Sequence, residues 1–570
     1  MELERRIAVA RGEEPADLVL RKAHLVNVLS GEIHQTDVAV SDGGIVGLGP
    51  GYEGKEEMDL EGHFLCPGFL DGHLHVESTM LQVAEFARTV VPHGTTTVIL
   101  DPHEIANVAG VEGIRYILDS SEGAALSIYV MLPSCVPATD METPGATLTA
   151  DDLAPLLAHP RVLGVAEVMN FPGVLFRAPE VLRKVKLAGN RPVDGHAPGL
   201  SGKDLNAYIA AGIRSDHECT ALEEAQEKLR RGMYVMLREG TTEHNLRTLL
   251  PLVTPQNARR FLLVSDDRHP DDLMDQGHVD HSLRLAMQAG LDPVVAIQMA
   301  TLNTAERFGL RDLGAVAPGY RADLVVLDDL KDVRVAMVFK DGRLVARDGA
   351  LLPSAPRPPA VPLSNTVRVD WEKVHFEVPA AGTRARVIQV LPDQILTRAL
   401  IEEVRVEDGL AVADPERDLL KLAVIERHHA SGNVALGFVR GFRLRRGALA
   451  STVGHDSHNL LVVGADDVDM EAAARHVAQV GGGFVAVARG QVLADLPLPI
   501  GGLMSDQPAE AVRREMDRLL HVARAELGSR LPNPFMTLSF VALPVIPELR
   551  LTDKGLVDVA KFQFVPLFVQ

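Results

Sequence analysis

The chain has 570 residues, of which 46% are hydrophobic and 24% charged, and its formal net charge is −20. This is globular composition in a chain too long for one compact core, so we expect two to four domains. No apolar run approaches the roughly 20 residues that a membrane-spanning helix needs, and the acidic balance opposes nucleic-acid binding, which depends on Lys and Arg neutralising phosphates. We therefore expect a small-molecule substrate, with no membrane and no nucleic acid as partners.

The N-terminal sequence and the cysteines indicate the cellular compartment. The first 20 residues have mixed charge and lack the apolar block of a secretory signal, which predicts a cytoplasmic protein. The three cysteines, Cys66, Cys135 and Cys219, form no CxxC pair. Neither a disulfide framework nor a thiolate metal site is predicted, so imidazole and carboxylate groups would have to hold any metal.

Two groups of short strands flank the central part of the chain. The first group lies within residues 1–65, and the second, which includes ADLVVLDD and VRVAMVFKDGRLVARDG, lies within residues 315–352. Gly and Asp punctuate both groups, as they do between strands. We predict that the two groups pair into one small β-sandwich domain.

The region between them, residues 66–314, alternates short apolar strands with longer helical patterns, which is typical of βα units. Helical spacing appears in ALEEAQEKLRR and HNLRTLLPLV. Eight strands are predicted: FLDGHLH, TTTVILD, LSIYVML, VLGVAEV, RPVDGHA, IRSDHE, MYVMLRE and FLLVSDD. The predicted fold class is therefore α/β, with a TIM-like (β/α)8 barrel whose functional groups gather at the C-terminal ends of its strands.

The composition changes after the second strand group. Residues 353–365, within LLPSAPRPPAVPLSN, are predicted to form a proline-rich linker. Residues 366–570 contain new strands, such as GNVALGFVRGF, NLLVVGA and GGFVAVARG, and a charged helix, AEAVRREMDRLLHVARAEL. This pattern predicts a separate C-terminal α+β domain.

The stretch PGFLDGHLHVEST carries the first candidate metal ligands. Residues two apart on a strand share a face, and four side chains are expected to point the same way: Asp71, His73, His75 and Glu77. Apolar runs of later strands also end in an imidazole or a carboxylate, at Glu167, His196, His217 and Asp266. Four histidines and two carboxylates on one barrel rim predict a two-metal site with a bridging carboxylate.

Each of these residues also has a simpler interpretation. Glu167 and Asp266 would cap the helices that follow them, and His196 and His217 would be hydrogen-bonded rim histidines. Active sites on this architecture occupy the same rim, so the joint placement favours the metal site.

The order of HxH, a strand-end acid, His, His and Asp resembles the amidohydrolase superfamily, whose members activate a hydrolytic water on one or two metals in a barrel mouth. Many relatives carry a carbamylated lysine after the fourth strand, where this chain has Glu167. Lys184 and Lys186 come later in the sequence and are interpreted as surface charge.

The resemblance narrows to the adenine deaminase family on motifs that run from the first barrel strand almost to the C-terminus. These motifs are PGFLDGHLHVEST, HGTTTVILDPHEIANV, HAPGLSG, SDHE, VSDDRHPDDLMDQGHVDHSLR, TVGHDSHN, LPLPIGGLMSD and LSFVALPVIPELRLTD.

This resemblance implies a hydrolase that converts adenine into hypoxanthine and ammonia in purine salvage, and it implies a homodimer. It implies two divalent ions per chain, Mn²⁺ or Fe²⁺, although the ligand types also suit Zn²⁺. Glu167 would bridge the ions, Asp266 would bind one ion and take a proton from the attacking water, and the remaining ligands would be His73, His75, His196 and His217.

The resemblance leaves open which acid protonates the purine ring. Glu77 and Glu104 are the catalytic candidates. Substrate-binding or orienting roles are expected for Asp101, His103, Arg238, Glu239, His455, Asp456 and His458. Arg238 and Glu239 stand where smaller residues fit the family pattern. The segment GHDSHN is either a turn that satisfies its own backbone or part of a domain that closes the barrel mouth.

Two alternatives are kept. The first is an amidohydrolase that acts on an N6-substituted adenine or on a cyclic amide such as a hydantoin; the missing strand-four lysine and the C-terminal domain count against a cyclic amide. The second is a non-catalytic purine-binding protein, against which the complete ligand set counts. The cytidine-deaminase type of zinc site, which combines HxE with PCxxC, is not predicted, because the sequence has no PCxxC motif.

Overall fold

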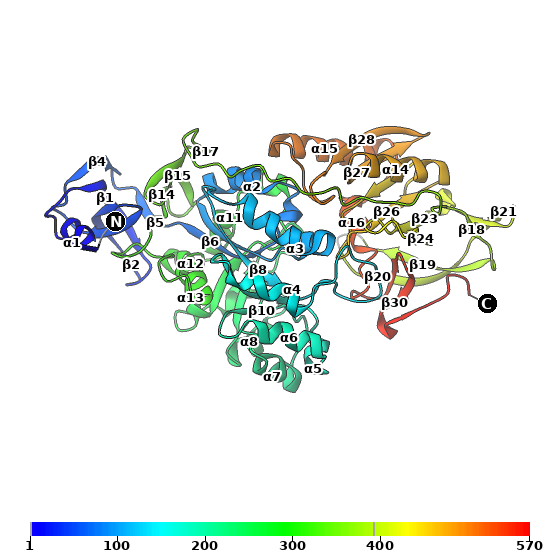
Figure 1. The fold of residues 1–570 in the computed structure, drawn as a ribbon, viewed down its shortest axis with the longest axis horizontal. Coiled ribbons are helices and arrows are strands. Elements are labelled where there is room, and N and C mark those ends of the chain that lie inside the picture. The colour runs from blue at the N-terminus through cyan, green and yellow to red at the C-terminus, as the bar shows by residue number, and fades with distance from the viewer. Residues whose placement is uncertain (1–2, 392–393, 570) are drawn as a thin grey trace.

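Three bodies follow one another along the longest axis of the molecule (Figure 1). The computed structural model describes residues 3–391 and 394–569. Positions 1, 2, 392, 393 and 570, which belong to the ranges predicted for the N-terminal and C-terminal domains, lie outside the described residues. None of the helices in the described ranges combines the length and apolar character needed to cross a bilayer.

The central body is an eight-stranded parallel sheet, and it confirms the predicted (β/α)8 barrel. Each strand pairs with the next one along the chain, and a parallel bridge between Leu74 and Asp266 joins the last strand to the first. Apolar side chains that include Leu70, Ile99 and Met236 pack together as one buried cluster. The strands are β6 (Phe69–Leu74), β7 (Thr95–Leu100), β8 (Ser127–Pro133), β9 (Val162–Val168), β10 (Val193–Gly195), β11 (Ser215–Asp216), β12 (Tyr234–Arg238) and β13 (Phe261–Val264).

Helices follow the barrel strands as the periodicity predicts. In α8 (Leu222–Arg230), acidic Glu223 and Glu224 lie in the first turn and Lys228 and Arg230 in the last, an order that complements the helix dipole. The other main helices around the barrel are α2 (Val83–Val90), α3 (His103–Ser120), α6 (Pro179–Leu187), α7 (Gly202–Ala210), α11 (Val279–Gln288), α12 (Pro293–Met299) and α13 (Leu302–Phe308).

The helix predicted from HNLRTLLPLV is shorter than its periodicity indicates. The structure has one α-turn, α9 (Leu246–Leu249), followed by a 3-10 turn, η4 (Leu250–Leu252). Pro251 has no backbone N–H, and its ring clashes with the carbonyl four residues earlier in a continuous α-helix. The proline therefore ends the α-helix.

The N-terminal body is a nine-stranded sheet built from both ends of the barrel sequence. Strands β5 and β14 join the two groups in antiparallel register, with Cys66 opposite Val325. A buried cluster that includes Leu25 and Phe339 packs against this sheet. The strands are β1 (Ala16–Asn27), β2 (Glu32–Ser41), β3 (Gly44–Leu48), β4 (Gly54–Asp59), β5 (Phe64–Pro67), β14 (Leu324–Asp329), β15 (Arg334–Lys340), β16 (Arg343–Arg347) and β17 (Ala350–Leu351).

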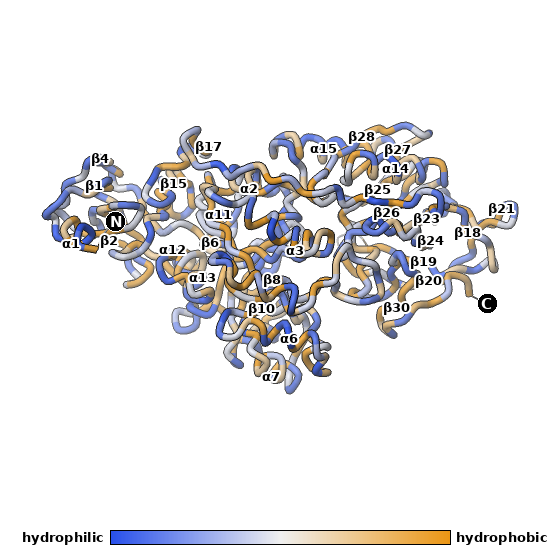
Figure 2. The backbone as a smooth tube through the Cα atoms, viewed as in Figure 1, coloured by the Kyte–Doolittle hydropathy of each residue, from blue (hydrophilic) through white to orange (hydrophobic). Residues whose placement is uncertain are grey.

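The C-terminal body contains an eight-stranded sheet in the order β20-β19-β24-β23-β26-β25-β27-β28. Helix α15 (Ala509–Ala525) buries Val512, Met516, Leu519 and Ala523, which recur at helical spacing on one face. The sheet strands are β19 (Arg384–Val390), β20 (Thr397–Glu403), β23 (Leu420–Ile425), β24 (Val434–Arg440), β25 (Ala448–Ser451), β26 (Leu460–Gly464), β27 (Gly483–Ala488) and β28 (Gln491–Pro497), and the other helices are α14 (Asp467–Gln479) and α16 (Pro534–Phe540). Figure 2 shows orange, hydrophobic segments in both this body and the barrel.

One apolar cluster extends from the barrel into the C-terminal body. It contains barrel residues such as Met80 and Ile105 together with Leu503 and Phe535 from the C-terminal body. The backbone N–H of Ser505 donates a 2.8 Å hydrogen bond to the carbonyl of Met80. The C-terminal body is thus held against the end of the barrel at which the strands terminate.

Candidate metal centre

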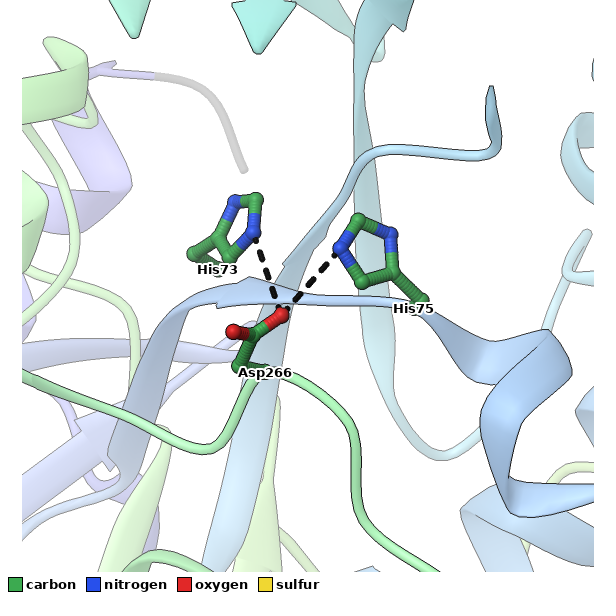
Figure 3. Close-up of side chains that lie close together, drawn as sticks. All are labelled: His73, His75 and Asp266. Carbon is green, nitrogen blue, oxygen red and sulfur yellow. Dashed lines mark ion pairs between the residues drawn. The ribbon is translucent and has the colours of Figure 1, made fainter. Parts of the chain in front are cut away.

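Figure 3 shows a first group of predicted ligands, which come from β6, the residue after it and the turn after β13. Nε2 of His73 lies 3.6 Å from Oδ1 of Asp266, and Nε2 of His75 lies 3.2 Å from the same oxygen. Ligand atoms bound to one ion at about 2.1 Å are roughly 3.4 Å apart in tetrahedral geometry. The spacing of this group therefore suits a single ion.

The backbone after β13 turns Asp266 back over the barrel. Asp266 has a φ of 59°, a left-handed conformation that aspartate tolerates better than most residues. Its backbone N–H donates a 3.0 Å hydrogen bond to the carbonyl of His73. This bond fixes the carboxylate beside His73 and His75.

A second group of ligands surrounds Glu167 at the end of β9. Oε2 of Glu167 lies 2.8 Å from Nδ1 of His196 and 2.9 Å from Nε2 of His217. The other oxygen, Oε1, lies 3.6 Å from Nε2 of His75 in the first group. Glu167 therefore presents one oxygen to each group, which is the arrangement that a bridging carboxylate needs.

Both carboxylates at the centre are buried and ionised. Burial alone would favour their neutral forms, but the imidazoles of His196 and His217 hold the pKa of Glu167 well below its ordinary value. Against the same burial effect, the Arg238 guanidinium holds the pKa of Asp266 well below its ordinary value. Ionised carboxylates are the form that binds divalent metals.

The residues fit a pair of divalent ions. Nε2 of His73, which faces Asp266, is a buried nitrogen without a hydrogen-bond partner in the described chain, although buried polar atoms are nearly always paired. Together with Glu167 and Asp266, the set of imidazoles and carboxylates suits Zn²⁺, Mn²⁺ and Fe²⁺.

Asp101 orients two of these side chains. Its backbone carbonyl lies 2.8 Å from Nδ1 of His75, which leaves Nε2 of that ring to face the centre. Its carboxylate accepts a 2.7 Å hydrogen bond from the backbone N–H of Glu167. Asp101 therefore supports the ligands from β6 and β9.

The helix-capping interpretations of the strand-end acids are wrong. The helix after β9, α5 (Phe171–Leu175), has Asn170 at its N-cap, and the Asn170 side chain accepts from the backbone of Gly173. The helix after β13, α10 (Pro270–Asp275), has His269 at its N-cap. Glu167 and Asp266 are therefore free of capping roles.

The shared strand face predicted from Asp71 to Glu77 stops at His75. Strand β6 ends at Leu74, and Glu77 lies in a 3-10 turn, η1 (Val76–Thr79). Oε1 of Glu77 accepts a 3.0 Å hydrogen bond from the backbone N–H of Ile105, whereas its Oε2 has no partner in the described chain. The turn, not strand alternation, brings Glu77 to the barrel mouth.

Arg238 reaches the centre from the end of β12. Its Nη1 donates a 2.6 Å hydrogen bond to Oδ2 of Asp266, and its Nη2 donates to Oε2 of Glu218 at 3.2 Å. Oε1 of Glu218 lies 3.7 Å from both Nδ1 of His196 and Nε2 of His217. Sequence reasoning missed Glu218, although it directly follows the strand-end His217.

Glu239 belongs to a different group of contacts. Its Oε1 lies 2.8 Å from Nδ1 of His244, and its backbone carbonyl accepts from Arg268 at 3.0 Å. Among the described residues, none of the groups of side chains that lie close enough to share a metal ion includes Glu239.

The interpretation of Lys184 as surface charge is wrong. Lys184 is buried, and its Nζ donates a 2.8 Å hydrogen bond to the carbonyl of Ser134. The Ser134 hydroxyl donates in turn to the carbonyl of Glu167 at 2.5 Å. Lys184 therefore supports the end of β9, while Lys186 is exposed.

The C-terminal body contributes side chains to the barrel mouth from the segment GHDSHN. Nδ1 of His455 lies 2.9 Å from Oε1 of Glu104, and Nε2 of His458 contacts Oε2 of the same carboxylate. His103 places Nε2 3.3 Å from Oε1 of Glu104 and Nδ1 3.8 Å from Oε1 of Glu167. The closing role predicted for GHDSHN therefore agrees with these contacts.

A cavity lies between the barrel and the C-terminal body beside these groups. Most of its wall is apolar, and several polar side chains also line it. Its lining includes Glu77, Ser78, Met80, Glu104, His269, Val453, His455, His458, Phe484, Leu503, Met516, Phe535 and Met536. An apolar cavity with a few converging polar groups is the common form of a small-molecule site.

Comparison with known proteins identifies the family. The amidohydrolase family model matches residues 64–345, and the model of the adenine deaminase C-terminal domain matches residues 394–563. The chain is 54% identical over 564 residues to an adenine deaminase of Desulfatibacillum aliphaticivorans, with 99% of each chain covered. It is 51% identical over 562 residues to an adenine deaminase 2 of Carboxydothermus hydrogenoformans, with 98% of each covered.

The chain belongs to the adenine deaminase family. The resemblance inferred from the motifs is thereby confirmed. Membership of this family within the amidohydrolases makes the chain a metal-dependent hydrolase.

Proposed function

We propose that the protein hydrolyses adenine to hypoxanthine and ammonia in purine salvage, at a centre that holds two divalent ions between His73, His75, Glu167, His196, His217 and Asp266. The observation that carries the proposal is the position of Glu167, whose two oxygens face different ligand groups. Family membership supports adenine as the substrate, because relatives about half identical over almost their full length are named adenine deaminases.

The chemistry of the proposed ions is the activation of water. When bound, divalent ions lower the pKa of water toward neutrality and so supply hydroxide for attack on C6 of adenine. Asp266 lies at the first ligand group, with Oδ1 beside His75 and Oδ2 held by Arg238. In the proposed reaction this carboxylate takes the proton of the attacking water and passes it to the departing amino group.

Glu77 is the favoured donor of the ring proton. It lines the cavity, and its Oε2 has no hydrogen-bond partner in the described chain. Burial raises the pKa of Glu77 to about 7. Glu104 is less suited to this step because His455 and His458 contact both of its oxygens.

The metal, the assembly and the compartment are part of the proposal. Imidazole and carboxylate ligands suit Mn²⁺ and Fe²⁺, which the family resemblance favours over Zn²⁺. The homodimer rests on the same resemblance, and sedimentation of the purified protein tests it. A cytoplasmic location is supported by Cys66, Cys135 and Cys219, which are buried and unpaired.

Ammonia release from adenine tests the activity. The protein is reconstituted with Mn²⁺ and given adenine, adenosine, N6-methyladenine or a hydantoin, and bound metal is counted in the same samples. Rapid release from adenine alone is the expected result. If adenine gives no ammonia while the metal ligands are filled, adenine is the wrong substrate, and release from N6-methyladenine or the hydantoin would identify the alternative class.

A further inference from the structure

A second cluster of possible metal ligands lies beside the proposed pair of ions. Ligand atoms of His103, Glu104 and Asp456 lie within 4.8 Å of one another, and all three residues are buried. The neighbouring Nδ1 of His455 lies 2.9 Å from Oε1 of Glu104 and 3.9 Å from Oδ1 of Asp456. The deamination steps proposed above do not use this cluster.

The spacing within the cluster is that of a coordination shell. Oε1 of Glu104 is 3.3 Å from Nε2 of His103 and 2.9 Å from Nδ1 of His455. Ligands of one ion at about 2.1 Å are roughly 3.0 to 3.4 Å apart in octahedral or tetrahedral geometry. Oδ2 of Asp456 is buried without a hydrogen-bond partner in the described chain, which leaves a second oxygen of that carboxylate available.

The contacts divide between two parts of the chain. His103 and Glu104 begin helix α3 of the barrel, whereas His455 and Asp456 belong to the C-terminal body. An ion at this point would be held from both sides of the junction. His103 also faces the proposed pair, because its Nδ1 lies 3.8 Å from Oε1 of Glu167.

We propose a third divalent-cation site formed by His103, Glu104, His455 and Asp456, which ties the C-terminal body to the barrel mouth. Its two imidazoles and two carboxylates select the same class of ion as the pair, namely Mn²⁺, Fe²⁺ or Zn²⁺. The site does not require that adenine be the substrate. It adds one ion to the two that the proposed catalytic centre holds.

Metal counting on the whole chain tests this site. The protein is stripped with a chelator, dialysed against Mn²⁺ and assayed for bound Mn²⁺ by mass spectrometry. We expect about three ions per wild-type chain, and about two in Asp456→Asn and in His455→Ala. Crystals of the Mn²⁺ form should give three anomalous peaks per chain, one of them between Glu104 and His455. Two ions and two peaks in the wild type would overturn the proposal.

His476→Gln is the matched control. His476 lies in the same C-terminal body and also contacts a carboxylate, with Nε2 2.8 Å from Oδ2 of Asp495, but it belongs to none of the possible metal-ligand groups among the described residues. This variant should keep three ions. If Asp456→Asn loses more than one ion while its thermal unfolding resembles that of the wild type, the third site is not separate from the pair. Ammonia release, assayed in parallel, reports on the proposed deamination independently, because a chain that binds three ions and leaves adenine intact would refute only that activity.

Discussion

Asp266 joins two different environments through one carboxylate. Oδ1 faces His73 and His75, whereas Oδ2 accepts from Arg238. Such a division lets the arginine fix the orientation of the carboxylate while the other oxygen remains available to an ion or a water. The position of Asp266 therefore depends on the guanidinium as much as on its own backbone.

Replacing Asp266 by Asn tests the carboxylate itself. Asparagine keeps the size of the side chain but cannot accept the proton of the attacking water. We expect ammonia release to fall by about 10²- to 10⁴-fold, the usual contribution of a general base, with the far-UV circular dichroism of the wild type retained. His73→Ala should lower the bound metal as well as the activity. Near-normal turnover by the Asn variant would contradict the proposed role.

Replacing Arg238 by Lys tests the orientation of Asp266. Lysine keeps the charge but cannot contact Asp266 and Glu218 through a planar fork. Losing a hydrogen bond to a charged group costs about 1.5 to 3 kcal/mol, so kcat should fall by about 10- to 100-fold. Arg191→Lys is the control, because Arg191 donates to the backbone carbonyls of Val162 and Leu157 rather than to a carboxylate at the centre. If kcat falls equally in both variants, Arg238 stabilises the fold and does not orient Asp266 for the reaction.

Sequence patterns predicted the residues of the proposed centre more readily than the side chains that support them. His73, His75, Glu167, His196, His217 and Asp266 stand at or just after strand ends, where chain order and fold class determine position. Glu218, Lys184 and the contacts of Glu104 depend on side chains that meet across large sequence distances, as in the contact of Glu104 with His458. Periodicity carries no information about such contacts, so only the structure reveals them.

The bounds of a helix or strand are predictable where the local sequence alone determines them. Strand β9 has the predicted bounds Val162–Val168, because a short apolar run between turns admits few alternatives. Glu77 was placed on the wrong kind of element, because the extended pattern of β6 ends where the chain turns into η1. The boundaries predicted for the domains and the linker stay predictions.

Helix α11 contains an acidic group that should make stability depend on pH. Asp280 is buried in its first turn, and its Oδ2 lies 3.3 Å from Nδ1 of His93 and 2.7 Å from Nη1 of Arg284. Burial favours the neutral acid, but His93 and Arg284 outweigh it and lower the pKa of Asp280 to about 2. The carboxylate is therefore ionised in the folded protein at pH values where it is partly protonated in the unfolded chain.

The pKa of Asp280 is lower in the folded protein than its value of about 3.9 in the unfolded chain, so ionisation of Asp280 increases the free energy of unfolding. This stabilisation is fully present at pH values above the unfolded pKa. That contribution, about 2 to 3 kcal/mol, is lost as the pH falls from about 4 to about 2. Asp280→Asn should therefore unfold at a lower temperature than the wild type at pH 6, and the difference in Tm should shrink from pH 4 downward. Calorimetry of both proteins from pH 6 to pH 3 checks this. A constant difference would show that Asp280 stabilises only through packing.

The loop after β8 is held by the C-terminal body. Oδ1 of Asp553 accepts from the backbone N–H of Thr143 at 2.9 Å, and its Oδ2 accepts from the Thr143 hydroxyl at 2.6 Å. Without these bonds the loop should open more often, because loops with few contacts open at little free-energy cost. Asp553→Ala should make the loop more sensitive to protease and raise KM for adenine more than it lowers kcat.

Asp558→Ala is the comparison for this loop. Asp558 accepts from the backbone N–H and from Nζ of Lys561, within a surface turn of the same C-terminal body rather than across the junction with the barrel. Digestion at the rate of the wild type is expected for this variant. If protease cuts the loop of Asp553→Ala no faster than the loop of the wild type, the hydrogen bonds of Asp553 do not hold the loop in place.

At the scale of the whole molecule, the cavity depends on the junction between two bodies. The cavity wall combines Glu77 and Met80 of the barrel with Phe484 and Phe535 of the C-terminal body. The apolar cluster that crosses this junction should couple the folding of the two bodies, since separating them would expose it to water. Ion binding at the barrel mouth is then expected to stabilise the C-terminal body as well.

Trp371 makes this coupling measurable. It is the single tryptophan of the chain, and it lies half-buried in the C-terminal body with the Arg475 guanidinium 4.6 Å from its ring centroid. Mn²⁺ at 100 times its dissociation constant stabilises the folded state by about 2.7 kcal/mol per site. Because the cluster at the junction joins the two bodies, Mn²⁺ should raise the temperature at which Trp371 fluorescence changes, and the shift should be smaller in His73→Ala. If Mn²⁺ moves the calorimetric transition of the barrel but leaves the Trp371 transition in place, the two bodies unfold independently, and the apolar cluster between them does not transmit the stabilisation.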